Sequence, residues 1–166
     1  MFDSPWDTLV RRYSSLVISS ALRVLGCLAD AEDIAQDVFL EAFRKWSPDE
    51  QHAWPGLLRR MAICRALDLL RTRQRSESLE SSRIDKRAAD PSDNLVKQEV
   101  HTQLRAAVAN LPQRESEVFC LSCFEQLSNE EIADVLQVSR GSVAVALSKA
   151  KSRLTEMFQP TSGDPK

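Results

Sequence analysis

The sequence predicts an all-α protein of two small helical domains joined by a flexible linker, with a helix-turn-helix in the C-terminal domain. Apolar residues recur every three or four positions over several long stretches, which is the period of an amphipathic helix. Between residues 76 and 93 this pattern ends, and Ser, Asp, Arg and Glu dominate, as in a linker that cannot bury a core. We therefore expect domains at 1–75 and 94–158, followed by a polar tail at 159–166.

Three helices are expected in the N-terminal domain. The first covers residues 6–25 and ends near Gly26, a residue suited to the C-terminal cap of a helix. The second begins at residue 30 or 31 and continues to about 46, with a regular apolar stripe. The third begins near Pro55, which fits the first turn of a helix, and continues to about residue 73.

The C-terminal domain is expected to end in a helix-turn-helix. A helix over 94–111 is interrupted by Pro112, and another helix follows over 113–126. In the stretch 128–154, Ser128 can cap a short helix while Glu131 returns a bond to the Ser128 backbone, and Ser139 can cap a longer helix. A short capped helix leading into a longer basic one is the outline of a DNA-binding helix-turn-helix, although a plain helical hairpin has the same outline.

The charges fall into two patches of opposite sign. The net charge of the 166 residues is −2, which alone argues against a general nucleic-acid binder. Residues 30–50, however, hold seven acids and two basic residues, whereas residues 59–75 hold six arginines and one acid. This distribution predicts one basic partner and one anionic partner. The absence of a membrane-length apolar run or a signal-peptide pattern predicts a cytoplasmic protein without membrane insertion.

The four cysteines raise the question of a metal or redox site. Cys120 and Cys123 form a C-x-x-C pair, which occurs in such sites. Apolar neighbours surround the pair, and no second Cys/His pair stands at zinc spacing, so core packing is favoured. We expect no metal and no cofactor. The sequence also has no glycine-rich phosphate loop, nucleophile–base pair or paired acids placed for catalysis, and we expect no enzymatic activity.

Two stretches resemble one family, in the same order and at the right separation. DAEDIAQDVFLEAFRKW followed by AWPGLLRRMAICRALDLLRTRQR resembles region 2 of bacterial sigma factors of the sigma-70 family. LPQRESEVFCLSCFEQLSNEEIADVLQVSRGSVAVALSKAKSRL resembles their region 4. The short length and the direct linker resemble the extracytoplasmic-function (ECF) class. The resemblance implies a transcription initiation factor whose partners are core RNA polymerase and promoter DNA, with an anti-sigma protein as a further partner.

The resemblance also assigns residues to three surfaces. The second helix would bind polymerase through Asp33, Gln36, Asp37, Leu40, Glu41 and Trp46. The third helix would bind and melt the −10 element through Trp54, Arg59, Arg60, Arg65, Arg71 and Arg73. The helix-turn-helix would bind the −35 element through Ser139, Arg140, Ser142, Lys149, Lys151 and Arg153. For each tryptophan, core packing is the alternative role.

The sequence departs from the family pattern at several positions. Ala144, Val145 and Ala146 stand where basic residues are typical, which predicts fewer phosphate contacts and a weaker salt dependence of DNA binding. Gln137 stands where glycine is common, so either its backbone adopts a positive φ or the turn is built differently. Cys64 replaces a frequent asparagine, which removes one expected DNA contact.

Other functions compatible with the sequence are a free-standing helix-turn-helix regulator and a degenerate sigma-like protein that sequesters a partner. A regulator would bind promoter duplex without polymerase. A sequestering protein would support no transcription, and the Ala144–Ala146 stretch is the feature that favours it. A helical enzyme has no candidate site.

Overall fold

The computed structural model describes residues 4–50, 52–79 and 94–159, and in these residues the chain forms helices and no strand. The N-terminal half contains α1 (Pro5–Leu25), α2 (Leu28–Lys45) and α3 (Trp54–Leu79). The C-terminal half contains α4 (Asn94–Ala109), α5 (Gln113–Phe119), a π-helical turn (Cys120–Phe124), α6 (Asn129–Leu136) and α7 (Arg140–Phe158). The predicted all-α class is confirmed.

The helix ends follow the local signals in the sequence. At the C-terminus of α1, Gly26 adopts the left-handed conformation with φ of 71°, and its N–H donates to the Leu22 carbonyl at 2.7 Å. Ser128 and Glu131 form the predicted capping box of α6: the Glu131 N–H donates to Ser128 Oγ, and the Ser128 N–H donates to Glu131 Oε2 at 2.7 Å. Ser139 caps α7 by accepting from the Ser142 N–H.

Three predicted boundaries are wrong. Helix α2 begins at Leu28, two residues before the predicted start, because the αL turn at Gly26 lets the chain re-enter a helix almost at once. Helix α3 continues to Leu79 rather than about residue 73, so the first four residues of the predicted linker are helical. The predicted single helix over 113–126 changes to π-helical geometry at Cys120. Residues 80–93, the rest of the predicted linker, and 160–166, most of the tail, lie outside the described residues.

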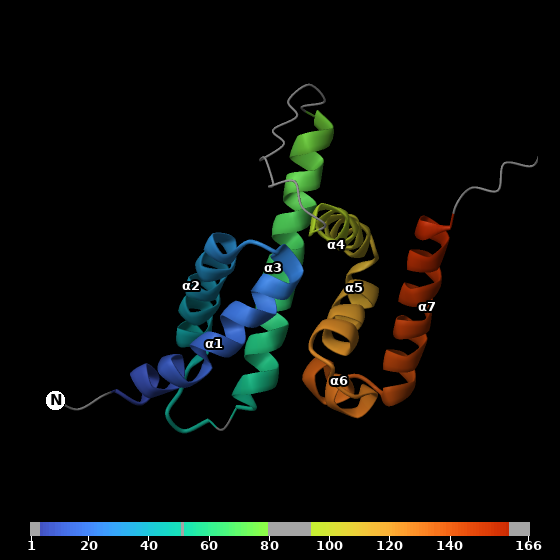
Figure 1. Ribbon diagram of the computed structural model, residues 1–166. Helices are drawn as coiled ribbons and strands as arrows, with labels where there is room; N and C mark the ends of the chain where they lie inside the picture. Colours follow the sequence, from blue (N-terminus) through green and yellow to red (C-terminus); the bar gives the residue numbers. More distant parts are fainter. Residues whose placement is uncertain (1–3, 51, 80–93, 160–166) are drawn as a thin grey trace, which may run out of the picture.

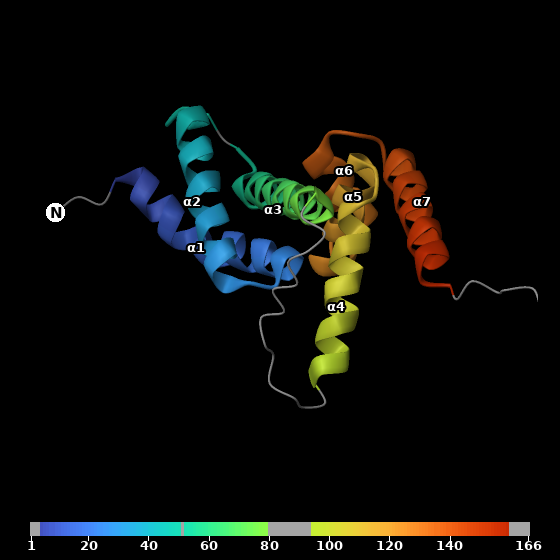
Figure 2. The same ribbon diagram turned by 90° about the horizontal axis from the view of Figure 1, so that it is seen from above.

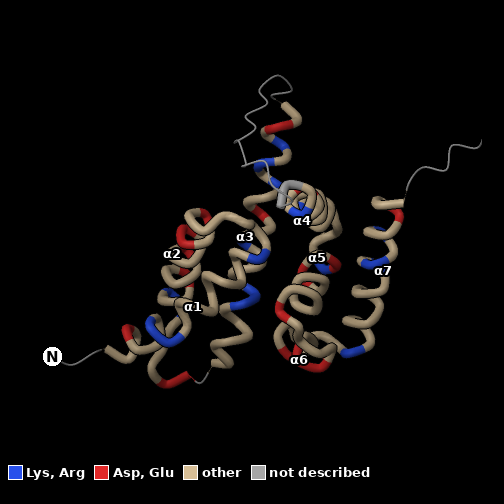
Figure 3. The backbone as a smooth tube through the Cα atoms, viewed as in Figure 1, with Lys and Arg blue, Asp and Glu red and all other residues tan. Residues whose placement is uncertain are grey.

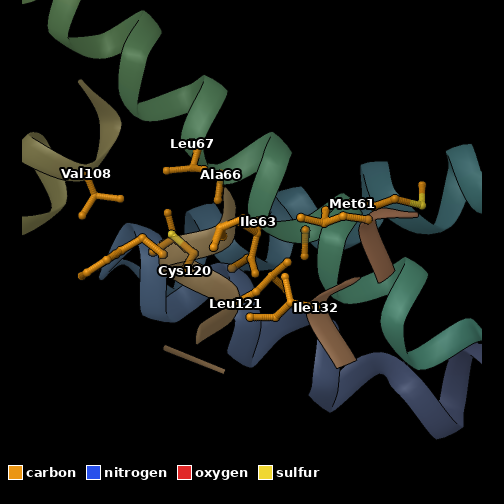
Figure 4. Close-up of a cluster of buried hydrophobic side chains, with 14 of the residues drawn as sticks. Met61, Ile63, Ala66, Leu67, Val108, Cys120, Leu121 and Ile132 are labelled. Carbon is orange, nitrogen blue, oxygen red and sulfur yellow. The ribbon is translucent and has the colours of Figure 1, made fainter. Parts of the chain in front are cut away.

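Helix α3 is the element that both halves share. Figures 1 and 2 show it between α1 and α2 on one side and α4, α5 and α6 on the other. Figure 4 shows the apolar contact: Ile63 of α3 lies near Leu121 of the π-helical turn and Ile132 of α6, and Leu67 of α3 belongs to the same buried cluster. All four side chains are almost fully buried. The buried residues of the two halves thus form one continuous core. Among the described helices, none has the length and apolarity needed to cross a membrane.

Candidate nucleic-acid interface

The stretch predicted to be a helix-turn-helix consists of α6 and α7, with a tight turn at Gln137 between them. Gln137 has φ of 55°, so the first of the two predicted possibilities is correct and a non-glycine residue occupies the left-handed region. Its side-chain Nε2 donates to the Asp134 carbonyl at 2.7 Å, and its backbone N–H donates to the Ala133 carbonyl. These bonds hold the turn that sets the direction of α7.

The predicted DNA-contacting residues of α7 all lie on its exposed side. Val143, Ala146, Ala150 and Leu154 form the buried stripe. The exposed residues of the predicted set are Ser139, Arg140, Ser142, Lys149, Lys151 and Arg153. At the positions that depart from the family pattern, Ala144 and Val145 are exposed and Ala146 is buried. Between Arg140 and Lys149 the exposed face therefore carries small and apolar side chains and no cation.

Arg153 differs from the other cations of α7 because it is paired within the protein. Its Nε lies 2.8 Å from Oε2 of Glu115, a carboxylate of α5 that is almost buried. Within the described residues, Arg140, Lys149 and Lys151 form no ion pair. Arg140, Lys149 and Lys151 are thus exposed cations, whereas Arg153 holds α7 against α5.

The arginine face of α3 (Arg59, Arg60, Arg65, Arg71 and Arg73) is largely engaged by the protein itself. Arg65 forms two hydrogen bonds to Glu41 of α2, the shorter at 2.6 Å, and Arg73 pairs with Asp30 at 2.7 Å. Arg59 and Arg71 contact the C-terminal half instead. In the described part of the chain, Arg60 is the member of the face without an ion pair. Figure 3 shows basic positions along α3 and acidic positions on α2 and α6.

Trp54 stands at the first position of α3, after the loop expected to read bases. Its ring meets the His52 ring edge to face, with centroids 4.9 Å apart, and it is half-buried against the core. Trp54 therefore packs on the core with one part of its side chain, and another part stays accessible.

The outer face of α2 carries exposed acids beside exposed apolar groups. Four of the residues predicted to bind polymerase are exposed, namely Asp33, Gln36, Asp37 and Leu40. Glu41 is less available because Lys45 and Arg65 bond to its carboxylate, and these bonds lower the pKa of Glu41 below its ordinary value. The charge pattern of the sequence did not predict the ion pair between Glu41 of α2 and Arg65 of α3.

Two members of this surface were missed in the sequence. The Phe43 ring is 53% exposed and stacks nearly parallel to Trp46, and the Trp6 ring of α1 meets Phe43 with centroids 5.0 Å apart. Phe43 continues the apolar stripe of α2 in the sequence, yet it lies outside the core. The sequence feature that could have identified Phe43 is its place beside Trp46 at the end of the acidic helix, together with a further tryptophan, Trp6, near the N-terminus.

A second apolar surface without a sequence prediction lies between α4, α5 and α7. It is a groove lined by Leu104, Phe119, Leu154 and Phe158. Phe158 is 47% exposed at the end of α7. The sequence feature that could have indicated this groove is Phe158, an aromatic residue on the last turn of α7 that lies beyond the buried apolar stripe of this helix.

Both cysteines of the C-x-x-C pair lie in the π-helical turn. Cys120 is buried in the core, and burial raises the pKa of its thiol above the ordinary range, whereas Cys123 is exposed. Among the described residues, no group of three His, Cys, Asp or Glu side chains is placed to hold a metal ion. In the structure, Cys120 acts as an apolar packing residue.

Comparison with known proteins identifies both halves. The family model for sigma-70 region 2 matches residues 9–76, and the model for sigma-70 region 4 matches residues 101–154. The chain is 29% identical over 163 residues to the ECF RNA polymerase sigma factor SigE of Mycolicibacterium smegmatis, covering 96% of this chain and 63% of that relative's length. It is 26% identical to the RNA polymerase sigma-H factor of Pseudomonas aeruginosa, covering 93% of this chain and 86% of the relative.

Two solved structures share the fold. One is CnrH in complex with the cytosolic domain of CnrY, with a TM-score of 0.58 and 20% identity over 92% of this chain and 86% of that one. The other is the sigma factor RpoE in complex with the anti-sigma factor NepR from Bartonella quintana, with a TM-score of 0.54 and 19% identity over 91% of this chain and 96% of that one. With region 2 and region 4 matched in order along most of the chain, this protein belongs to the sigma-70 family of RNA polymerase sigma factors, in its extracytoplasmic-function class.

Proposed function

We propose that this chain binds core RNA polymerase and directs it to promoters, where it recognises the −10 and −35 elements and helps to melt the −10 DNA. The observation that carries this proposal is the presence in one chain of two unlike surfaces. Region 2 has an exposed acidic and aromatic face on α2, and region 4 has a capped helix-turn-helix with outward-facing cations. The protein would act in the cytoplasm, and RNA synthesis would belong to the polymerase.

The α2 surface suits a basic partner with apolar side chains at its centre. Asp33 and Asp37 are exposed, and charges of this kind mainly accelerate and orient docking. Leu40 and Phe43 are 61% and 53% exposed, and buried apolar anchors supply most of the binding energy of an interface. We therefore assign core polymerase binding to this face, with Phe43 added to the residues predicted from the sequence.

Melting at the −10 element requires partners for bases that leave the stack. Aromatic rings that accept stacked bases, next to cations that follow the phosphates, are the usual solution. The accessible part of Trp54 and the guanidinium of Arg60 support this role at the N-terminal end of α3. Arg59 and Arg71 can contribute only when their contacts with region 4 are released.

Recognition of the −35 element would use the exposed face of α7 in the major groove. Arg140 lies on the first turn and can reach a guanine edge, and Val145 offers an apolar surface that suits a thymine methyl group. With so few cations, region 4 alone would bind duplex weakly and with a shallow salt dependence. We therefore expect specific promoter binding only when polymerase is present.

An anti-sigma protein is the third proposed partner. Both solved structures described above hold a sigma-like chain with a second protein, named as an anti-sigma factor in one of them. The apolar groove between α4, α5 and α7 and the α2 face are two exposed surfaces that such a protein could cover.

The decisive experiment is genome-wide run-off transcription with core polymerase reconstituted with this protein. We expect new transcripts whose start sites share −10 and −35 motifs, and gel-shift of those promoters only with core present. Arg140→Ala should reduce transcription from promoters that depend on the −35 element, and Lys97→Ala, which removes an exposed cation from α4, should not. Promoter binding without core would favour a free-standing regulator. Binding to core without any specific transcript would favour sequestration.

A further inference from the structure

A carboxylate of α5 that is almost fully buried is matched to one cation of α7. Oε2 of Glu115 lies 2.8 Å from Nε of Arg153, whose side chain is half exposed. Among the described residues, this oxygen has no other ion-pair or hydrogen-bond partner. Removing the cation would leave the carboxylate without a partner, and a buried charge in that state is costly. The pair therefore joins the third residue of α5 to the C-terminal part of α7.

The pair borders the side of α7 that is expected to read the −35 element. Val145, Lys149 and Arg153 follow one another at intervals of four residues, so they share one side of the helix. Glu115 lines the same surface depression as Val145 and Lys149. Figure 1 shows α5 beside α7, and the two helices pack directly on each other. The ion pair thus lies next to the reading side of α7 rather than behind it.

Two contacts fix the placement of α7. At its N-terminal end, the positive-φ turn at Gln137 and the Ser139 cap set the direction of the helix. Arg153 stands fourteen residues after Ser139, about 20 Å further along the axis. Between these points, α7 presents small apolar residues such as Ala146 and Ala150 to the core. Apolar contact is non-directional, so this stripe alone does not fix the rotation of α7 about its own axis. The ion pair with α5 therefore sets that rotation.

The rotation of α7 matters because its reading side carries short side chains. Ser142 and Val145 are exposed, and neither can extend to follow a displaced base edge, since serine is short and valine is stiff at χ1. The outer atoms of a helix lie about 6 Å from its axis, so a rotation of about 20° moves them by about 2 Å. A hydrogen bond does not survive a shift of that size. A long arginine could compensate for it, whereas these two side chains cannot.

We propose that Glu115 and Arg153 are positioning residues for −35 recognition, which hold α7 in the rotation at which its short side chains meet the bases. Arg153 acts through the placement of α7 and not through a contact with DNA phosphate. This inference rests on the proposed function, because it requires that α7 reads the −35 element. It accounts for the pairing of Arg153 with an almost buried acid, whereas Arg140 and Lys149 form no ion pair within the described residues.

Two other roles of the pair would give different results. A phosphate contact carries no sequence information, so Arg153→Gln would weaken binding to all promoters alike and lower the salt slope of binding by about one, while Glu115→Gln would not weaken binding. A purely structural pair would change the folded fraction, and transcription from every template would fall by the same factor. A positioning pair differs from both, because its loss lowers the discrimination between promoter sequences among folded molecules.

The first readout is transcription by the reconstituted holoenzyme from a promoter found by run-off transcription and from the same promoter with a scrambled −35 element. We expect Glu115→Gln and Arg153→Gln each to lower the ratio of intact to scrambled transcription about three- to ten-fold, while the scrambled template loses nothing. The double variant should lose no more than either single variant, because both break one pair. Lys97→Gln and Glu99→Gln, the same changes at exposed charges of α4, should keep the wild-type ratio. A wild-type ratio in both single variants of the pair would overturn the proposal.

The second readout needs neither polymerase nor DNA. Nitroxide labels at Ser148→Cys of α7 and Thr102→Cys of α4 report the placement of α7 by pulsed electron resonance, in a full chain whose native thiols that are not buried (Cys27, Cys64 and Cys123) are replaced by serine. We expect one narrow distance with the pair intact, and a broader or shifted one in Glu115→Gln and Arg153→Gln with unchanged circular dichroism. Unchanged distances would overturn the positioning role. If wild type gives no specific transcript, the proposed function fails, and the distances still decide whether the pair places α7.

Discussion

Cys64 provides a native probe of the contact between the two halves. It lies on α3, and its thiol donates to Oε1 of Glu117 on α5 at 3.3 Å. Burial raises the pKa of the Cys64 thiol from its ordinary value of 9.0 to about 12, and the Glu117 carboxylate adds to this shift. The fold therefore favours the protonated thiol. Its contribution to stability is complete below pH 9.0 and is lost as the pH rises toward 12.

The shift sets the expected rate of alkylation. Only the thiolate is nucleophilic, so the rate follows the ionised fraction. At pH 8 a pKa of 9.0 leaves about one thiol in ten ionised, whereas a pKa of about 12 leaves about one in ten thousand. Cys64 in the native protein should therefore react with iodoacetamide about a thousand-fold more slowly than in the unfolded chain. Glu117→Gln removes the charge but not the burial, and it should recover part of this difference.

The assay is mass spectrometry of the Cys64 peptide after timed alkylation, with the exposed Cys123 as an internal reference in the same molecule. Adding core polymerase should accelerate the reaction at Cys64 if polymerase holds the halves apart. Native Cys64 that reacts as fast as Cys123 at pH 8 would refute the described contact between α3 and α5.

Three further predictions concern stability and docking. Leu121→Ala removes a fully buried side chain where both halves meet, and it should lower the free energy of unfolding by about 2–5 kcal/mol in urea titrations. Gln137→Gly places a glycine at the positive φ of 55° and should raise the melting temperature, by an amount that corresponds to about 1 kcal/mol of unfolding free energy. A lowered melting temperature would mean that the lost hydrogen bond of the Gln137 side chain outweighs the relief of backbone strain. Reversing the charge at Asp33 and Asp37 should weaken pull-down of core polymerase while the circular dichroism spectrum stays unchanged, because both side chains are exposed.

The helices and their caps could be predicted because their causes are local. The capping box of Ser128 and Glu131 and the αL turn at Gly26 depend on a few neighbouring residues. The π-helical turn at Cys120 could not be predicted in the same way, since its hydrogen bonds depend on how that segment packs against α1 and α6. Helix α3 extends to Leu79 although its apolar stripe ends earlier, partly because Gln74 is held by the end of α4.

The partners of the arginines were beyond a reading of the sequence. Six arginines with one acid nearby in the chain predict a free basic patch, but the acids and carbonyls that meet Arg59 and Arg71 come from 38 to 66 residues away. A weak signal was present in Glu115, Glu117 and Glu125, which border the apolar run of α5. Acids placed so close to a core require partners, because an unpaired buried charge is costly.

The energies indicate what can open the closed form. An ion pair with partly exposed arginines, such as that of Glu125, contributes about 1 kcal/mol or less. To change the ratio of open to closed molecules from 1:99 to 99:1, a partner must bind the open form more tightly than the closed form by about 5.5 kcal/mol. Losing the Glu125 contact alone is therefore too small a change. The buried cluster that Ile63 and Leu67 share with Leu121 must also be broken, and a partner that binds only the open form must supply that energy. A partner that binds α2 and region 4 at two separated sites would do so, and the same separation would release Arg59 and Arg71 from their contacts with the C-terminal half.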